Sequence, residues 1–232
     1  MRLTFTKYHI WLGWLAGGPI LIWMVSGLFM ALKPIEQVRG EHLRTDPPVL
    51  AMDQTVPVAP LFDSDVRPVS RVELVQQATG PVWLIRYQDG GGRRAAADTG
   101  EWLAPELTGA EAAEIARAAY AGDNPLTDMR KFGAEENPFD LRRGRPAWRA
   151  RFGTSTNLYV DAETGEVLAL RTGWWRAFDF MWGLHIMDLG EREDTSHPIL
   201  IGSAILALLM SLLGLIILPW RYIRKRRVKR RS

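Results

Sequence analysis

Two stretches of the sequence determine the fold: residues 81–104 read PVWLIRYQDGGGRRAAADTGEWLA, and residues 146–169 read PAWRARFGTSTNLYVDAETGEVLA. They align without a gap at an offset of 65 residues, which places Trp83 opposite Trp148 and superimposes two Thr-Gly-Glu triplets. Such a repeat indicates one supersecondary unit used twice. Each copy is typical of an aromatic strand, a turn, a second strand and a Thr-Gly-Glu exit.

The sequence around the two copies predicts an α+β domain with antiparallel strands and a covering helix. The helix is expected over 108–120, because Thr108 can cap it and Glu111 occupies the capping-box position. Gly100 and Gly165 of the triplets fit turns that need a positive φ, so the triplets are expected to be structural. Alternating and aromatic runs predict strands at 69–75, 81–88, 93–97, 126–132, 148–152, 158–160 and 167–170.

Two uncharged segments flank this domain: residues 10–32 (IWLGWLAGGPILIWMVSGLFMAL) and residues 198–220 (PILIGSAILALLMSLLGLIILPW). About 20 apolar residues in a helix cross a bilayer core, so both are predicted to be transmembrane helices. The alternative for the first segment is a cleaved signal peptide. Its apolar run is longer than the usual core of roughly 7–15 residues, which favours a span.

The charge distribution predicts the orientation. Residues 221–232 contain eight basic and no acidic residues, whereas residues 33–220 contain 19 basic and 26 acidic residues. The positive-inside rule therefore predicts cytoplasmic termini and a periplasmic or otherwise extracytoplasmic domain in a two-pass protein of the bacterial inner (plasma) membrane. The basic tail is expected to bind anionic lipids, and nucleic acid is not expected as a partner because the basic residues are terminal.

These predictions divide the chain into eight parts. They are the cytoplasmic N-terminus (1–9), the first span (10–32), a proline-rich connector (33–68), a degenerate first repeat (69–107), the second repeat (108–173), an amphipathic interfacial segment (174–197), the second span (198–220) and the basic tail (221–232).

Small residues in both spans predict close helix packing, either between the two spans or between copies in a homodimer or a larger membrane complex. Gly13 and Gly17 form a G-x-x-x-G pattern in the first span. In the second, the small residues expected on one side are Ser203, Ala207, Ser211 and Gly214.

Three motifs resemble the PepSY domain and the PepSY-associated transmembrane family. Residues 159–167 (YVDAETGEV) are similar to the end of a PepSY unit, and residues 9–14 (HIWLGW) and 182–185 (WGLH) are similar to the family's membrane-proximal segments. The first copy, at 98–101, departs from the pattern and has no clear preceding helix. Many relatives have four spans where this sequence has two.

The histidines are the candidate ligands. By sequence position His42, His185 and His197 lie just outside the membrane on the outward side, and His9 lies at the cytoplasmic edge. Some relatives are haem-bearing reductases of iron-siderophore complexes, so the resemblance implies haem b with His9 and His185 as the matching ligands. These two should be roughly 30 Å apart. A shared iron therefore needs a dimer, or a His185–His197 pair on one side. The tentative haem or metal ligands are thus His9, His185 and His197.

Two interpretations are open for the acidic residues that follow His185. They could form a site for a hard cation, or they could be a solvated acidic linker. The residues concerned are Asp188, Glu191, Glu193 and Asp194.

No phosphate-binding loop, nucleophile elbow, zinc-protease motif or dinucleotide fingerprint is present in the sequence. The favoured function is therefore a membrane-anchored binding or regulatory protein, without a catalytic motif of its own. The resemblance implies an extracytoplasmic peptidase as one partner. The alternative is a haem-bearing transmembrane electron-transfer component of iron-siderophore or metal uptake, with a metal-uptake partner. A third reading is a structural subunit of a membrane complex. Because the sequence contains no cysteine, disulfides and thiolate metal sites are excluded.

Overall fold

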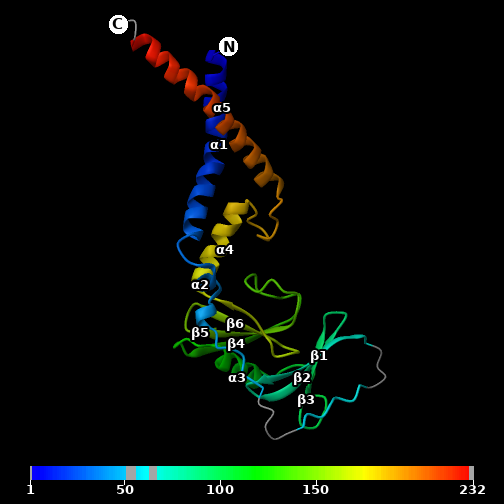
Figure 1. The fold of residues 1–232 in the computed structure, drawn as a ribbon. Helices are drawn as coiled ribbons and strands as arrows, with labels where there is room; N and C mark the ends of the chain where they lie inside the picture. Colours follow the sequence, from blue (N-terminus) through cyan, green and yellow to red (C-terminus); the bar gives the residue numbers. More distant parts are fainter. Residues whose placement is uncertain (1, 51–55, 63–66, 230–232) are drawn as a thin grey trace. The chain divides into compact units, whose positions relative to one another are not determined.

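The computed structural model describes residues 2–50, 56–62 and 67–229. The chain divides into two units (Figure 1). The helical unit consists of Met1–Pro34 and Ala177–Ser232, and the α+β unit consists of Ile35–Arg176. An α+β region between two long apolar helices is the predicted fold class, and the structure confirms it at that level.

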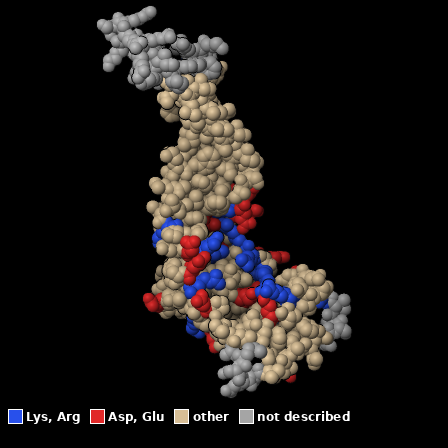
Figure 2. Space-filling model, in the orientation of Figure 1, with Lys and Arg blue, Asp and Glu red and all other residues tan. Residues whose placement is uncertain are grey.

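The helical unit is built on α1 (Arg2–Met30) and α5 (Pro198–Lys229), with α4 (Gly173–Ile186) entering it from residue 177. The segments Thr6–Met30 and Pro198–Leu218 are long and apolar enough to cross a membrane. Apart from Lys7, neither segment contains a charged residue, and the face drawn in Figure 2 is uncharged along the described part of both helices. On α1, partly or fully buried residues recur at the three- and four-residue spacing of a helix–helix contact: positions 9, 13, 16, 20, 23 and 27.

The α+β unit contains two antiparallel sheets. The first has the order β1 (Val69–Gln77), β2 (Gly80–Tyr87) and β3 (Gly92–Ala96). The second has the order β4 (Leu126–Phe132), β5 (Ala147–Phe152), β6 (Thr156–Asp161) and β7 (Val167–Arg171). All seven predicted strands are present, with bounds within two residues of the expected ones.

One helix covers the second sheet. This helix, α3 (Gly109–Ala119), begins with the predicted capping box between Thr108 and Glu111. Its apolar face meets the second sheet in a cluster that includes the buried residues Ala112, Ile115, Ala116, Ala150, Leu158 and Val160. Burying such a face supplies most of the stability of a helix this short.

The β2–β3 and β5–β6 hairpins pair in the same register. Val82 pairs with Ala96, and the residues 65 positions later, Ala147 and Asp161, pair with each other. The strands before the hairpins also correspond, because β1 and β4 each have a register shift two residues from the start. The 65-residue offset in the sequence is thus also an offset in hydrogen-bond pairing.

The chain segment that leads into each set of strands, here called the entry, is held by a similar hydrogen bond in both copies. The carbonyl of Val58 accepts a hydrogen bond from Trp83 Nε1 at 2.8 Å, and the carbonyl of Leu107 accepts one from Trp148 Nε1 at 3.1 Å. Between this entry and the next strand the first copy has ten residues (59–68) and the second has eighteen (108–125). Helix α3 occupies the longer segment, whereas the described residues of the shorter one include no helix.

The connector contains two short helices, α2 (Ile35–Arg39) and η1 (Glu41–Leu43), and Val38 is buried. Of the small residues in the two long helices, Gly17 and Ser211 are exposed. A Cβ at Gly13 would lie 3.9 Å from Met210 Sδ, so Gly13 does face α5.

Candidate functional site

His9 lies on the side of α1 that faces α5. A Cβ placed on Gly214 would lie 3.2 Å from His9 Cε1, so this glycine makes room for the imidazole. His9 Nδ1 is buried and has no hydrogen-bond partner among the described residues. A polar ring atom left unpaired between apolar helices is costly in a bilayer, which makes this position a candidate site.

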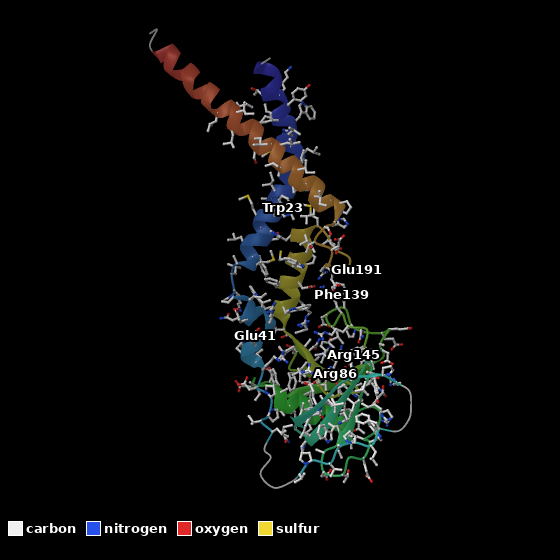
Figure 3. All side chains as sticks on the ribbon, turned by 45° about the vertical axis from the view of Figure 1, so that its right-hand side comes forward. Trp23, Glu41, Arg86, Phe139, Arg145 and Glu191 are labelled. Atoms are coloured by element: carbon white, nitrogen blue, oxygen red, sulfur yellow. The ribbon has the colours of Figure 1, made fainter. Side chains whose placement is uncertain are left out.

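His185 lies near the end of α4 and contacts α1. Its Nδ1 is 3.0 Å from Ser26 Oγ, and its backbone carbonyl accepts a hydrogen bond from Trp23 Nε1 at 2.7 Å (Trp23 is labelled in Figure 3). Ser26 Oγ also donates to the Ile22 carbonyl at 2.7 Å. Because a hydroxyl has one hydrogen, this geometry favours a proton on His185 Nδ1 and a free lone pair on Nε2.

The two histidines named by the family motifs do not form one site within a single chain. His9 and Ser26 are seventeen residues apart on α1, which is about 26 Å along a helix. Since His185 contacts Ser26, it lies near the opposite end of α1 from His9. The predicted separation of these two residues therefore agrees with the structure.

His197 immediately precedes α5, and its Nδ1 is buried without a described partner. Gly13 faces Met210 and His9 faces Gly214. Because the residue number rises along one helix as it falls along the other, α1 and α5 are antiparallel. His197, just before the start of α5, therefore lies toward the end of α1 that His185 contacts through Ser26. Among the described residues, no group of three or more histidines and carboxylates could hold a metal ion.

The acidic segment after α4 is organised by its own backbone. The Asp188 carboxylate accepts N–H groups from Gly190, Glu193 and Asp194 at 3.1–3.2 Å. Desolvation raises the pKa of Asp188, but these backbone donors outweigh it and the net shift is downward. The arrangement is that of a loop stabilised by an ionised carboxylate, and it matches the second of the two readings from sequence. His42, in η1, is exposed.

The second Thr-Gly-Glu triplet joins the two sheets. Glu166 forms a charged hydrogen bond with Arg86 of β2, and the Thr164 carbonyl accepts a hydrogen bond from Gln77 Nε2 at 2.6 Å. The pKa of Arg86 is raised, mainly by the hydrogen bond to Glu166. Arg86 and Arg145 are labelled in Figure 3. Arg145 contacts the same turn, with its Nε 2.7 Å from an Asp161 carboxylate oxygen. Gly100 and Gly165 have φ of 73° and 74°, which confirms the predicted turns.

A cavity of about 610 Å³ lies next to this junction, within the α+β unit. Its size is in the range of ligand sites, which are mostly apolar with a few polar groups. Its walls come from the connector, the end of β1, the second half of α3 and the turn before β7. The lining includes Glu41, Arg44, Asp46, Pro47, Pro48, Val75, Gln76, Gln77, Leu84, Ile115, Ala118, Glu166 and Val167.

Gln77 is a buried amide in the lining of this cavity. Its Nε2 donates to the Thr164 carbonyl, and its Oε1 is buried without a hydrogen-bond partner among the described residues. An unpaired buried acceptor costs about 1–3 kcal/mol of stability. No sequence motif identifies Gln77, because its only local signal is an amide on the same strand face as the apolar Val75, two residues earlier.

Two apolar helices of spanning length and an α+β unit between them define a membrane protein. Residues 6–232 match the family described as PepSY-associated TM region. The chain belongs to this family, as the sequence motifs indicated. No curated protein and no solved structure matches the chain.

Proposed function

We propose that this protein is a membrane-anchored PepSY protein whose α+β unit is an extracytoplasmic binding or regulatory module. The observation that carries the proposal is the cavity of about 610 Å³ in the α+β unit, whose lining combines apolar residues such as Leu84 and Ile115 with polar ones such as Gln76 and Glu41. A regulatory module needs a site that a ligand or partner can occupy, and this cavity has the volume and polarity of such a site. The matching registers of the two hairpins support a duplicated PepSY-like unit as its scaffold.

The proposed topology follows from charge. The basic tail lies after the second span and the acidic excess lies between the spans, which supports cytoplasmic termini and an outward α+β unit. This orientation places the cavity where an extracytoplasmic ligand or peptidase reaches it. The proposed location is the bacterial inner (plasma) membrane.

Cysteine alkylation tests both parts of the proposal, because the native chain contains no competing thiol. Ala118→Cys places a thiol on the cavity wall, and Arg117→Cys places one on an exposed position of the same helix outside the cavity. A membrane-impermeant maleimide should label Arg117→Cys in cells with a permeabilised outer membrane, but not Lys7→Cys at the N-terminus.

Occupancy is measured as a ratio of alkylation rates. If a cellular ligand fills the cavity, the rate at Ala118→Cys relative to Arg117→Cys is lower in cells than in the purified full-length protein. Equal ratios in cells and in purified protein would show an unoccupied cavity and would contradict the proposed function.

A second candidate function is haem-dependent electron transfer. The observation that favours it is the position of His185 and His197 toward the same end of α1, together with the Nε2 lone pair that the Ser26 contact leaves on His185. A hydrogen bond at the second ring nitrogen is typical of ligating histidines. Haem would supply one-electron chemistry, and these two side chains would hold it. Its test is a Soret band in membranes from cells supplied with haem. The band should be lost on His185→Ala or His197→Ala and retained on His9→Ala, and colourless membranes would exclude this function.

A further inference from the structure

The cavity in the α+β unit reaches the edge of a sheet. Val75, Gln76 and Gln77 are consecutive residues of β1, and all three line it. Neighbouring side chains on a strand point to opposite faces, so a cavity that contacts all three extends past the strand edge. Among the described strands, β1 is the outer strand of its sheet, and β7, which contributes Val167, is the outer strand of the other.

The segment that faces this edge is not suited to complete the sheet. The connector wall of the cavity includes Pro47 and Pro48. Proline has no backbone N–H and cannot donate to a ladder of strand hydrogen bonds. An edge strand with unpaired N–H and C=O groups is a template for an added strand.

The interior of the cavity fits an apolar side chain. Leu84 and Ile115 are buried apolar residues of its lining, and Val75 and Val167 are partly buried. An aliphatic side chain of a ligand buries apolar surface against these four residues.

The mouth of the cavity carries acidic groups. Glu41 and Asp46 are exposed, and neither forms an ion pair with another described residue. Glu166 is already neutralised by Arg86, and Arg44 is the one basic residue of the lining. Two free carboxylates against one guanidinium favour a cationic ligand and raise its association rate at low salt.

We propose that the cavity binds an extended peptide segment that alternates basic and aliphatic residues and lies along β1. An aliphatic side chain fills the cavity, and basic side chains lie at Glu41 and Asp46. The inference rests on the proposed function, since it names the ligand class of the same site.

The experiment is a titration of the full-length protein in nanodiscs of zwitterionic lipid, which avoids attraction of a basic peptide to anionic lipid. The probe is a fluorescein-labelled peptide, acetyl-Lys-Val-Lys-Leu-Lys-Val-amide, and the readout is fluorescence anisotropy. Saturable binding is expected with the protein and not with empty nanodiscs. The acidic counterpart, acetyl-Glu-Val-Glu-Leu-Glu-Val-amide, should not bind.

Two sets of variants test the site without disturbing the core. Ala118→Phe fills the mouth of the cavity from an exposed helix position and should weaken binding at least tenfold, whereas its matched control Arg117→Phe should leave it unchanged. The double charge reversal Glu41→Lys/Asp46→Lys should weaken binding about tenfold, more at low than at high salt.

The outcomes separate this inference from the proposed function. If the peptide does not bind at up to 1 mM, or binds equally to Ala118→Phe, the peptide inference is wrong. If the alkylation ratio at Ala118→Cys still falls in cells, the cavity holds a ligand of another class and the proposed function stands. If neither peptide binding nor a lower ratio is observed, both proposals fail.

Discussion

The two hairpins of the α+β unit share a register and differ in what covers them. The β5–β6 hairpin lies under α3, and Leu158 and Val160 of β6 are fully buried. In β3 the corresponding positions are Arg93, which is half-buried, and Ala95. The first copy has eight residues fewer between its entry and its first strand, too few for the eleven-residue α3 and its connections. The two hairpins thus share their strand pairing, and the helix accompanies only the longer of the two preceding segments.

The Thr-Gly-Glu triplets show the same contrast. In the second copy Glu166 forms an ion pair with Arg86 that joins the two sheets. Glu101, the corresponding residue of the first copy, is exposed. Both glycines have the same backbone conformation. Turn geometry is therefore common to both copies, and the joining role belongs to one of them.

The largest expected difference between the copies is in their cores. Leu158→Ala should lower the free energy of unfolding by about 2–5 kcal/mol, because it opens a cavity beneath α3. Arg93→Ala, at the corresponding position, should cost under about 1 kcal/mol, since it removes a partly exposed cation–π contact with Trp102. Urea unfolding of the full-length protein in micelles gives both values, with hydrogen–deuterium exchange of the two hairpins as the local readout. Equal effects at the two positions would contradict the assignment of α3 to one hairpin only.

The turn glycines should show a smaller and more even effect. Gly100→Ala and Gly165→Ala each force an L-residue into the left-handed region, at a cost of about 1–2 kcal/mol. At Gly100 the added Cβ would lie 2.7 Å from the Ala59 carbonyl oxygen, whereas at Gly165 it would lie 2.8 Å from the Gln77 side-chain amide. A side chain moves more easily than a backbone, so Gly100→Ala should be the more destabilising. The same unfolding measurement tests the order, and Gly90→Ala is the control at an open turn position with positive φ.

The local pattern of the sequence was sufficient to predict the helices and strands, but it was insufficient to predict the candidate site. Strand alternation, the turn glycines and the capping box of Thr108 are set by near neighbours, so the strands and α3 could be predicted. The Gln77–Thr164 contact and the cavity beside it join residues 87 positions apart. They depend on how two sheets pack, which no periodicity encodes. The same limit applies to the contact of His185 with Ser26, which is 159 positions away.

The copies should also differ in their response to alkaline pH. Tyr159 of β6 is buried and donates to Asp140 Oδ1 at 2.5 Å, and burial first and this carboxylate second raise its pKa well above the ordinary value. Because the folded state holds the proton more tightly, stability is fully present below about pH 10 and falls by about 1 kcal/mol per pH unit above it. The corresponding residue of β3 is Arg94, which has no phenolic hydroxyl.

Tyr159→Phe is the test of this pH effect. The variant loses the hydrogen bond to Asp140 and is less stable at neutral pH, but its stability should decline less steeply between pH 10 and 11. Comparison with Tyr87→Phe, whose ring is partly exposed in β2, separates the buried hydroxyl from general alkaline unfolding. Parallel pH profiles for the native protein and Tyr159→Phe would contradict the proposed origin of the slope.

The smallest expected effect concerns the bulges that both copies share. Ser70 Oγ donates to the Arg86 carbonyl and Thr127 Oγ1 donates to the Arg151 carbonyl, each at 3.1 Å. Both hydroxyls are exposed, so Ser70→Ala and Thr127→Ala should each cost only about 0.5 kcal/mol, at the lower end for a hydrogen bond. Near-equal values from unfolding would show that the bulge is used in the same way in both copies. A much larger loss at Thr127, which also donates to the Gly153 carbonyl, would mean that the turn after β5 and not the bulge needs the hydroxyl. The likeness of the copies would then be limited to strand pairing and turn geometry.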